Sequence, residues 1–464
     1  MWFQKGSLIL LILNCALSFS AEFDCIRFDH DQGPFSPITN ITKGAQKITK
    51  KIKLNETFEK KPYTLMVYIA ADNDLHYFAW NNIKQLARGA NKYMHIVVQL
   101  NEPGINKKTQ IYLIEKNKAI LLNKNNKAKL NSGDPKTLID FCTYSIENFP
   151  ADNYILDLSN HGSGSIDKKV SRLVNPTNLF FLNPANMMLE LDRSIEFLDY
   201  LQEKQYESPI TRGICFDETF HSYLSNQQLK QALAHVSNVA LDGKKLSMVW
   251  MDACLMAGIE ISALLKDYCN ILIASEEVEL GPGWRYDKVL KPFTNNQLLD
   301  EKEFAKHAVE AYGETYSSIT NDYTLSAINL SKVSEIEENI NNVGKAIELY
   351  IKQHSIAKKV IKKSKHKISF EEPSYIDLYS FYEQLIKNIH EIENQDHTQL
   401  LSLLKAGLDL IKDAIINNVA GPNIQYAKGV SIYLPEKGVH NSYINSEFAE
   451  NNNWSSFICN YTNN

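Results

Sequence analysis

Residues 245–258 read KLSMVWMDACLMAG, and the predicted fold and site both start from this stretch. Its first half is a short apolar run typical of a buried strand. The run ends at Asp252 and Cys254, before small residues that predict the start of a helix. Ligands bind at the carboxyl ends of strands in open α/β sheets, and a helix N-terminus lowers a thiol pKa. Cys254 is therefore a candidate nucleophile; the alternative is a small buried apolar residue.

Similar apolar runs occur at residues 63–70, 94–100 and 154–159, and helical stretches lie between them. This alternation predicts β-α-β units and a mostly parallel sheet in an α/β fold. The run at 154–159 is followed by His161 in the sequence NHGSG, so the His161 and Cys254 loops are expected at the same edge of the sheet. Further strands are predicted at residues 109–114, 270–274 and 323–330.

A cysteine nucleophile needs a neighbouring base, because only the thiolate attacks. His161 is the best placed of the 12 histidines, since it follows a buried strand and precedes a glycine that lets the backbone approach a substrate. The amides of Gly162 and Cys254 are candidates for the oxyanion hole of an acyl transfer. A hydrogen-bonded loop histidine with no catalytic role is the alternative for His161. The sequence contains no Gly-x-Ser-x-Gly, P-loop or His-Glu-x-x-His motif.

The chain divides into regions by composition. Residues 61–330 are predicted to form the catalytic domain, interrupted by an insertion at about 165–210 in which residues 188–202 have a helical pattern. Residues 331–464 are predicted to be mostly helical and to return a strand, residues 428–435, to the sheet.

The first 20 residues have the outline of a secretory signal peptide, with Lys5, an apolar run and small residues before a cleavage site after Ser20. A lipoprotein cysteine at Cys15 is the alternative. Residues 21–60 are polar and predict a weakly ordered leader or propeptide-like segment. Removing Cys15 leaves six widely spaced cysteines, and this spacing matches neither a zinc site nor a disulfide scaffold. The sequence leaves open whether one or two disulfides form.

Net charge and the length of the apolar runs argue against a nucleic-acid partner and against a membrane-spanning helix. A net charge of −5 over 464 residues argues against a nucleic-acid binder, and the lysine-rich residues 358–367 are best explained as a solvated helix face. After the N-terminal region, no apolar run reaches the roughly 20 residues that a membrane helix needs. The predicted partner is a peptide or protein substrate.

Four blocks resemble one known family. They are residues 66–75 (MVYIAADNDL), 160–164 (NHGSG), 251–256 (MDACLM) and 274–284 (ASEEVELGPGW), with an echo at 429–435 (GVSIYLP). In this order they resemble the clostripain-like cysteine peptidases, relatives of caspases, gingipains and legumains. The resemblance implies a caspase-like three-layer sandwich with a mostly parallel central sheet, and a cysteine endopeptidase activity.

The resemblance also assigns roles to residues. His161 matches the family's catalytic histidine and Cys254 its nucleophile, with Gly162 and Cys254 supplying the oxyanion amides. Asp252 matches an acid that binds a substrate Arg or Lys, and helix N-capping is its alternative. The second acid of that pocket is expected after the Gly-Trp pair. Arg285 occupies the next position, so Asp287, two residues further on, is the candidate. No asparagine that would orient the histidine can be identified in the sequence, and the resemblance does not imply one.

The predicted function is that of an exported cysteine endopeptidase cutting after basic residues. The alternative is a catalytically silent secreted or surface binding protein that uses residues 331–420 as its interaction face. The resemblance implies activation by a cut between the histidine and cysteine blocks, giving a monomer processed into two chains. No cofactor or metal is predicted; calcium stays open, although no EF-hand-like loop occurs. The candidate cut sites are Lys168, Lys169, Arg172, Arg193, Lys204 and Arg212.

Overall fold

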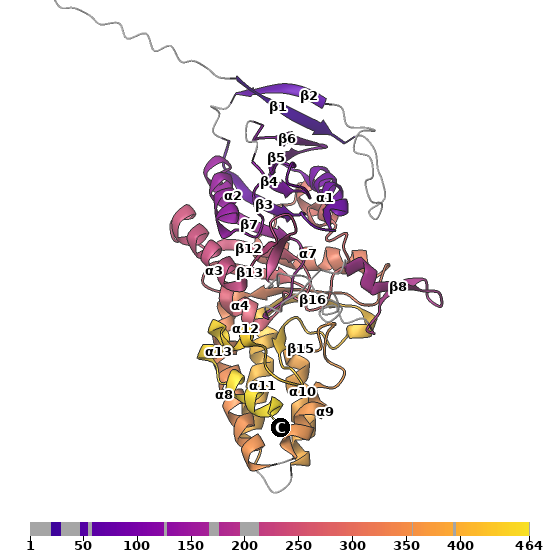
Figure 1. Ribbon diagram of the computed structural model, residues 1–464, viewed down its shortest axis with the longest axis vertical. Coiled ribbons are helices and arrows are strands. Elements are labelled where there is room, and N and C mark those ends of the chain that lie inside the picture. The colour runs from indigo at the N-terminus through magenta and orange to yellow at the C-terminus, as the bar shows by residue number, and fades with distance from the viewer. Residues whose placement is uncertain are drawn as a thin grey trace, which may run out of the picture.

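The computed structural model describes residues 20–28, 47–53, 58–124, 128–166, 176–194, 213–354, 356–392 and 396–463. In these residues the main sheet has eleven strands, which run across the upper two thirds of the molecule in Figure 1. In order across the sheet they are β16 (Ile415–Ala420), β14 (Thr324–Asn329), β13 (Cys269–Ala274), β12 (Leu246–Asp252), β7 (Ala151–Ser159), β3 (Lys61–Ala70), β4 (Met94–Asn101), β5 (Gln110–Glu115), β6 (Lys118–Leu121), β1 (Ser20–Arg27) and β2 (Lys47–Lys53).

The centre of the sheet is parallel and its two sides are antiparallel. Strands β13, β12, β7, β3 and β4 pair in parallel. Beyond them, β14 and β16 on one side and β5, β6, β1 and β2 on the other pair antiparallel. The predicted α/β class with a mostly parallel central sheet is confirmed.

Both faces of the sheet are covered because its central strands are apolar on both sides. In β3, Leu65 and Val67 pack into one core cluster, whereas Met66 and Tyr68 pack into the other. The first cluster is completed by α1 (His76–Gly89), α5 (Tyr286–Val289), α6 (Lys291–Thr294) and α7 (Glu301–Tyr316). The second is completed by α2 (Pro135–Asn148), α3 (Asn226–His235), the π-helix η2 (Val236–Ala240) and α4 (Ile259–Leu265). The result is a three-layer sandwich.

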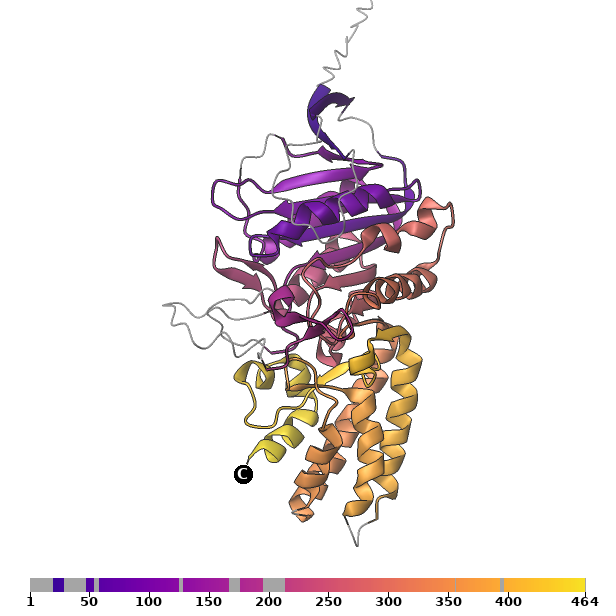
Figure 2. The ribbon, with the colours of Figure 1, turned by 90° about the vertical axis from the view of Figure 1, so that its right-hand side faces the viewer.

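The C-terminal part of the chain is helical and extends away from one end of the sheet, as the orange and yellow ribbon shows in Figure 2. Helix α8 packs against α11 and α14, and its apolar stripe joins the second core cluster. The helices are α8 (Val333–Gln353), α9 (Ala357–Lys365), α10 (Leu378–Asn388), α11 (Thr398–Ala414), α12 (Asn441–Ile444), α13 (Glu447–Asn451) and α14 (Trp454–Thr462), with 3-10 turns η1 (Pro176–Leu179), η3 (Leu330–Lys332), η4 (Ile389–Glu391) and η5 (Pro422–Ile424).

The strand that returns to the main sheet differs from the predicted one. Residues 428–435 were expected in that role, but within them β17 (Ser431–Tyr433) pairs with β15 (Tyr375–Asp377) in a separate two-stranded sheet. Strand β16 returns instead, and it forms the edge of the main sheet. Its residues are only half-buried, so its sequence lacks the apolar run that marks a central strand.

Two other segments also contain strands. The described part of residues 21–60 includes most of β1 together with β2, and these strands extend the sheet beyond β6. In the 165–210 insertion, β8 (Phe180–Asn183) and β9 (Met188–Leu191) form a hairpin, so the helical pattern predicted from residue 188 is wrong over β9. A shorter hairpin of β10 (Ile214–Asp217) and β11 (Ser222–Leu224) follows the insertion.

The predicted signal peptide, its cleavage site and Cys15 concern residues 1–20, which lie outside the described residues except for Ser20 at the start of β1. Among the helices of the described part, none is both long enough and apolar enough to cross a membrane.

Candidate active site

The register of two neighbouring parallel strands brings the His161 and Cys254 loops together. Strands β7 and β12 pair with Ser159 opposite Asp252, so the residues two positions further on emerge at the same level. The loops also touch. A Cβ atom on Gly162 would lie 2.5 Å from the carbonyl oxygen of Cys254, so only glycine fits there. The structure therefore places both residues at one edge of the sheet, as expected from the sequence.

His161 is held by a carboxylate that the sequence did not identify. Its Nε2 atom lies 2.7 Å from Asp74 Oδ1, and its side chain is fully buried. The other ring nitrogen, Nδ1, is buried and has no hydrogen-bond partner among the described residues. Asp74 does not cap the following helix, since α1 has Leu75 at its N-cap position. The position of Asp74 at the carboxyl end of β3 was the signal available in the sequence.

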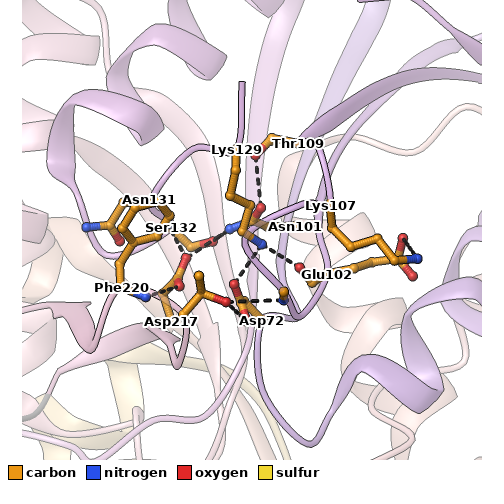
Figure 3. A network of polar contacts seen from close by, with 12 residues as sticks. Asp72, Asn101, Glu102, Lys107, Thr109, Lys129, Asn131, Ser132, Asp217 and Phe220 are labelled. Atoms are coloured by element: carbon orange, nitrogen blue, oxygen red, sulfur yellow. Dashed lines mark hydrogen bonds and ion pairs between the residues drawn. The ribbon is translucent and has the colours of Figure 1, made fainter. Parts of the chain in front are cut away.

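A network of polar contacts supports the loop that carries Asp74. Lys129 Nζ lies 2.6 Å from Asp72 Oδ2, and both side chains are almost fully buried. Asp217 lies beside Asp72 and accepts a hydrogen bond of 2.9 Å from the Asn101 amide. Because the network contains Lys129, its acids are compensated inside the protein. This Asp72 network consists of Asp72, Asn101, Lys129, Ser132 and Asp217 (Figure 3).

Cys254 is buried, and its thiol does not contact the histidine ring through a hydrogen bond. Its Sγ atom accepts a hydrogen bond from the Glu279 amide at 3.3 Å. The predicted helix start at Cys254 is wrong: α4 begins at Ile259, and Leu255 in between adopts a left-handed backbone with φ of 64°. No helix N-terminus therefore lowers the thiol pKa. Burial raises the pKa of Cys254 instead.

Asp252 belongs to a second group of acids, on the Cys254 side of the edge. One of its oxygens accepts hydrogen bonds from the Trp284 amide at 3.3 Å and from the Tyr286 hydroxyl at 2.9 Å. Asp252 does not cap α4, whose N-cap residue is Gly258. The same tyrosine hydroxyl lies 2.6 Å from an Asp157 oxygen. We call this group the Asp252 cluster; it consists of Asp157, Asp252, Glu279 and Tyr286.

The geometry of the Asp252 cluster shows where a proton is held. The Tyr286 hydroxyl has one hydrogen but contacts two carboxylates, so one of the two must be protonated. Burial and then the charge of Asp252 raise the pKa of Asp157 well above its usual value, whereas burial raises the pKa of Asp252 to about 6. Of the two acids, Asp157 therefore holds a proton more strongly, and Asp252 is the one that ionises first as pH rises.

Asp287 lies in a different setting from Asp252. Arg285 forms a bidentate ion pair with it, with both N···O distances at 2.9 Å. Burial alone would raise the pKa of Asp287, but the pair with Arg285 outweighs burial and lowers it. The expected second acid of the pocket is thus neutralised by the arginine beside it.

A cavity of about 30 Å³ adjoins Cys254, with room for about two water molecules. Its lining includes the acids Asp252 and Glu279 and the apolar residues Leu75 and Phe78. The space directly beside Cys254 is therefore narrow in this structure.

The insertion between the two loops is anchored next to the site. The Arg193 guanidinium contacts Glu277 at 3.0 Å and Asp322 at 3.3 Å, and both acids are buried. Arg193 is therefore engaged in ion pairs, unlike an exposed cut site. The other candidate cut sites lie outside the described residues: Lys168, Lys169, Arg172, Lys204 and Arg212.

The described residues hold neither a disulfide nor a group of three His, Cys, Asp or Glu side chains arranged for a metal ion. The cysteines that form no disulfide among the described residues are Cys25, Cys142, Cys215, Cys254, Cys269 and Cys459.

Comparison with known proteins identifies the family. The model of the clostripain family matches residues 67–176 and 199–460. The chain is 24% identical over 469 residues to clostripain from Hathewaya histolytica, covering 86% of this chain and 80% of that protein.

Two solved structures share the caspase-like fold. A secreted C11 cysteine protease from Bacteroides thetaiotaomicron, bound to an irreversible peptide inhibitor, has a TM-score of 0.55 at 16% identity over 86% of this chain and 99% of that chain. An inactive zymogen C11 protease from Parabacteroides distasonis has a TM-score of 0.56 at 15% identity, with the same coverage. Because the family model spans most of its length, this chain belongs to the clostripain family of cysteine endopeptidases.

Proposed function

We propose that the protein is an exported endopeptidase that cuts after basic residues, with Cys254 as nucleophile and His161 as acid and base. The observation that carries the proposal is the β7–β12 register, which sets both loops at the same level of one sheet edge. The close approach of Gly162 to the Cys254 carbonyl supports it further, because it joins the two loops without intervening side chains.

Asp74 joins this pair as a positioning residue. When His161 donates its Nε2 hydrogen to Asp74, the other nitrogen, Nδ1, is the basic one. That nitrogen is the one without a partner, so it is available for the thiol proton. The arrangement follows the general logic of a nucleophile, a base and a group that orients the base.

The proposed reaction has two steps. His161 Nδ1 takes the proton of Cys254, and the thiolate attacks the scissile carbonyl while the amides of Gly162 and Cys254 bind the oxyanion. The imidazolium then protonates the leaving amine, which gives a thioester. In the second step, His161 removes a proton from water, and the resulting attack releases the acid product and restores the thiol.

The preference for basic residues rests on the Asp252 cluster. Asp252 lines the cavity beside the nucleophile, and the lining contains no Lys or Arg. A positive side chain on the acyl side of the cut would compensate its charge.

Activation by a cut between the two loops is supported by the burial of the nucleophile. The thiol is buried, burial raises its pKa, and the cavity beside it is narrow. We propose that this single chain is the precursor, and that cleavage in the insertion lets the loops around Cys254 move apart.

Export is supported by the N-terminal pattern of residues 1–20 and by the secreted relative from Bacteroides thetaiotaomicron. N-terminal sequencing of the protein from its native host tests it: a mature chain that begins after Ser20 is expected, whereas an intact Met1 in the exported fraction contradicts it.

Hydrolysis of fluorogenic peptides ending in Arg or Lys tests the activity. After trypsin nicking of the insertion, wild-type protein should cleave them, and Cys254→Ala treated in the same way should not. No hydrolysis across a broad peptide library after nicking would refute the proposed activity of this chain. Mass spectrometry tests self-processing, because a Cys254→Ala protein cut at the same position as wild type would exclude its own active site as the agent.

Asp74→Asn tests the positioning role. We expect kcat to fall by roughly 10- to 100-fold with KM little changed, and the pH profile of kcat to move, because the imidazolium loses its carboxylate partner. Equal kcat and an unchanged pH profile would remove Asp74 from the mechanism.

A further inference from the structure

Glu279 is the one acid of the Asp252 cluster that none of the roles above uses. It is 95% buried, since only 5% of its surface is exposed, and it lines the cavity beside Cys254. Its own main-chain amide contacts the nucleophile's sulfur at 3.3 Å. Any substrate group that enters the cavity therefore passes within reach of this residue.

The carboxylate of Glu279 is only half satisfied. Its Oε2 atom accepts a hydrogen bond of 3.0 Å from the Trp284 indole, but Oε1 has no partner among the described residues. A buried carboxylate oxygen without a partner is costly, and such groups in folded proteins call for an explanation. Arg285, the nearest cation along the chain, is committed to Asp287.

We propose that Glu279 is a specificity-determining residue that supplies the second carboxylate for the basic side chain on the acyl side of the cut, together with Asp252. A guanidinium presents five N–H donors in a planar fork, which can bond two carboxylates at once. The apolar lining, including Leu75, Phe78 and Leu280, suits the methylene stem of such a side chain. Arginine should therefore be preferred over lysine.

This inference rests on the proposed function, but it replaces the acid expected after the Gly-Trp pair. The acid pair consists of Asp252 and Glu279, on the two chain segments that meet at Cys254. A neutral substrate side chain would leave both carboxylates unpaired, so the pocket selects against it.

Glu279→Gln tests the inference, because it keeps the shape of the side chain and cannot ionise when a cation binds. We expect the ratio of kcat/KM for Arg over norleucine substrates to fall at least tenfold, and the state of the thiol cancels in this ratio. Glu279→Asp should recover part of the Arg preference.

Glu260→Gln is the matched control. Glu260 is also a buried glutamate with an unpartnered oxygen, burial raises its pKa to about 7, and it does not line this cavity. Its substitution should leave the Arg preference unchanged. An intact Arg preference in Glu279→Gln would overturn the role of Glu279 alone. A wild-type enzyme without preference for basic residues would overturn the proposed specificity itself.

Discussion

Two groups of buried acids lie at the same edge of the sheet, and they differ in one respect. The Asp72 network contains Lys129, whose ammonium contacts Asp72 directly. The Asp252 cluster contains three acids and a tyrosine, and no Lys or Arg among the described residues lines its cavity. In the first group a buried ammonium balances Asp72, and the group holds the loop that carries Asp74. The second group is incomplete, and it lies beside the nucleophile.

The difference separates acids that stabilise the fold from acids that await a ligand. A buried ion pair is costly to break, whereas a buried carboxylate without a cation is costly to keep. Because burial raises the folded-state pKa of Asp252 to about 6, its contribution to stability is present below the usual carboxyl pKa of about 4 and is lost as pH rises through about 6. The Asp252 cluster thus lowers stability at the pH where its charge is available to bind a cation.

The largest effect is expected from Lys129→Ala, which removes the cation of the Asp72 network. It leaves Asp72 buried without compensation, and the free energy of unfolding should fall by about 3–5 kcal/mol. Urea denaturation measures it. Lys107→Ala is the control, because Lys107 is exposed and lies 3.9 Å from Glu102, so a change below about 1 kcal/mol is expected. Equal losses in the two variants would contradict the comparison.

Asp252→Asn should lower the activity towards Arg substrates without lowering stability, unlike Lys129→Ala. We expect kcat/KM for Arg substrates to fall about 100-fold, the equivalent of losing roughly 3 kcal/mol of a buried charge interaction, while the free energy of unfolding stays equal or rises. Asp377→Asn is the matched control: burial also raises the pKa of Asp377 to about 6, but its carboxylate accepts two main-chain N–H bonds away from the cavity. That variant should lose stability and keep its substrate preference. A lower free energy of unfolding for Asp252→Asn would argue against an Asp252 cluster that lacks a cation.

The pH dependence should be smaller, at about tenfold. Asp252 binds a cation only when ionised, and with a pKa of about 6 its ionised fraction falls about tenfold between pH 7 and pH 5. The ratio of kcat/KM for Arg over norleucine substrates should fall by the same factor, since titration of the thiol cancels in the ratio. A constant ratio over that range would show that Asp252 does not titrate where burial places it.

The smallest effect is expected from Arg193→Ala. The insertion supplies this cation to Glu277 and Asp322. Because the Arg193 side chain is 39% exposed, water can take its place beside the two acids, so we expect a local loss of about 1 kcal/mol. Limited proteolysis of the β8–β9 hairpin should quicken about fivefold, and the exposed pair variant Lys306→Ala should show no change. An unchanged proteolysis rate in Arg193→Ala would mean that the hairpin is held by its strand contacts alone.

Much of the framework could be predicted because its signal is local. Each central strand contains an apolar run that is followed by polar residues, so the sheet and its active edge follow from the sequence. The positions of His161 and Cys254 at that edge follow from the same pattern.

The remaining features depend on tertiary contacts. The contact of Asp74 with His161 could not be predicted, because an aspartate just before a helix is equally typical of a helix cap. The turn after Cys254 delays the start of α4 to Ile259, because Leu255 adopts a left-handed backbone conformation, which is uncommon for a leucine. Glu279 was part of a matching block, but only the fold shows that one of its oxygens has no partner.

The pairing of β7 with β12 has a consequence for a chain cut between residues 166 and 213. The cut would give two polypeptides, one carrying His161 and the other Cys254, joined along a strand ladder from Met248–Ile155 to Asp252–Ser159. This ladder lies at the centre of the sheet, so separating the two pieces would expose core side chains to water. The cut form would then be an obligate heterodimer, whose specific activity does not decline on dilution and in which neither polypeptide works alone.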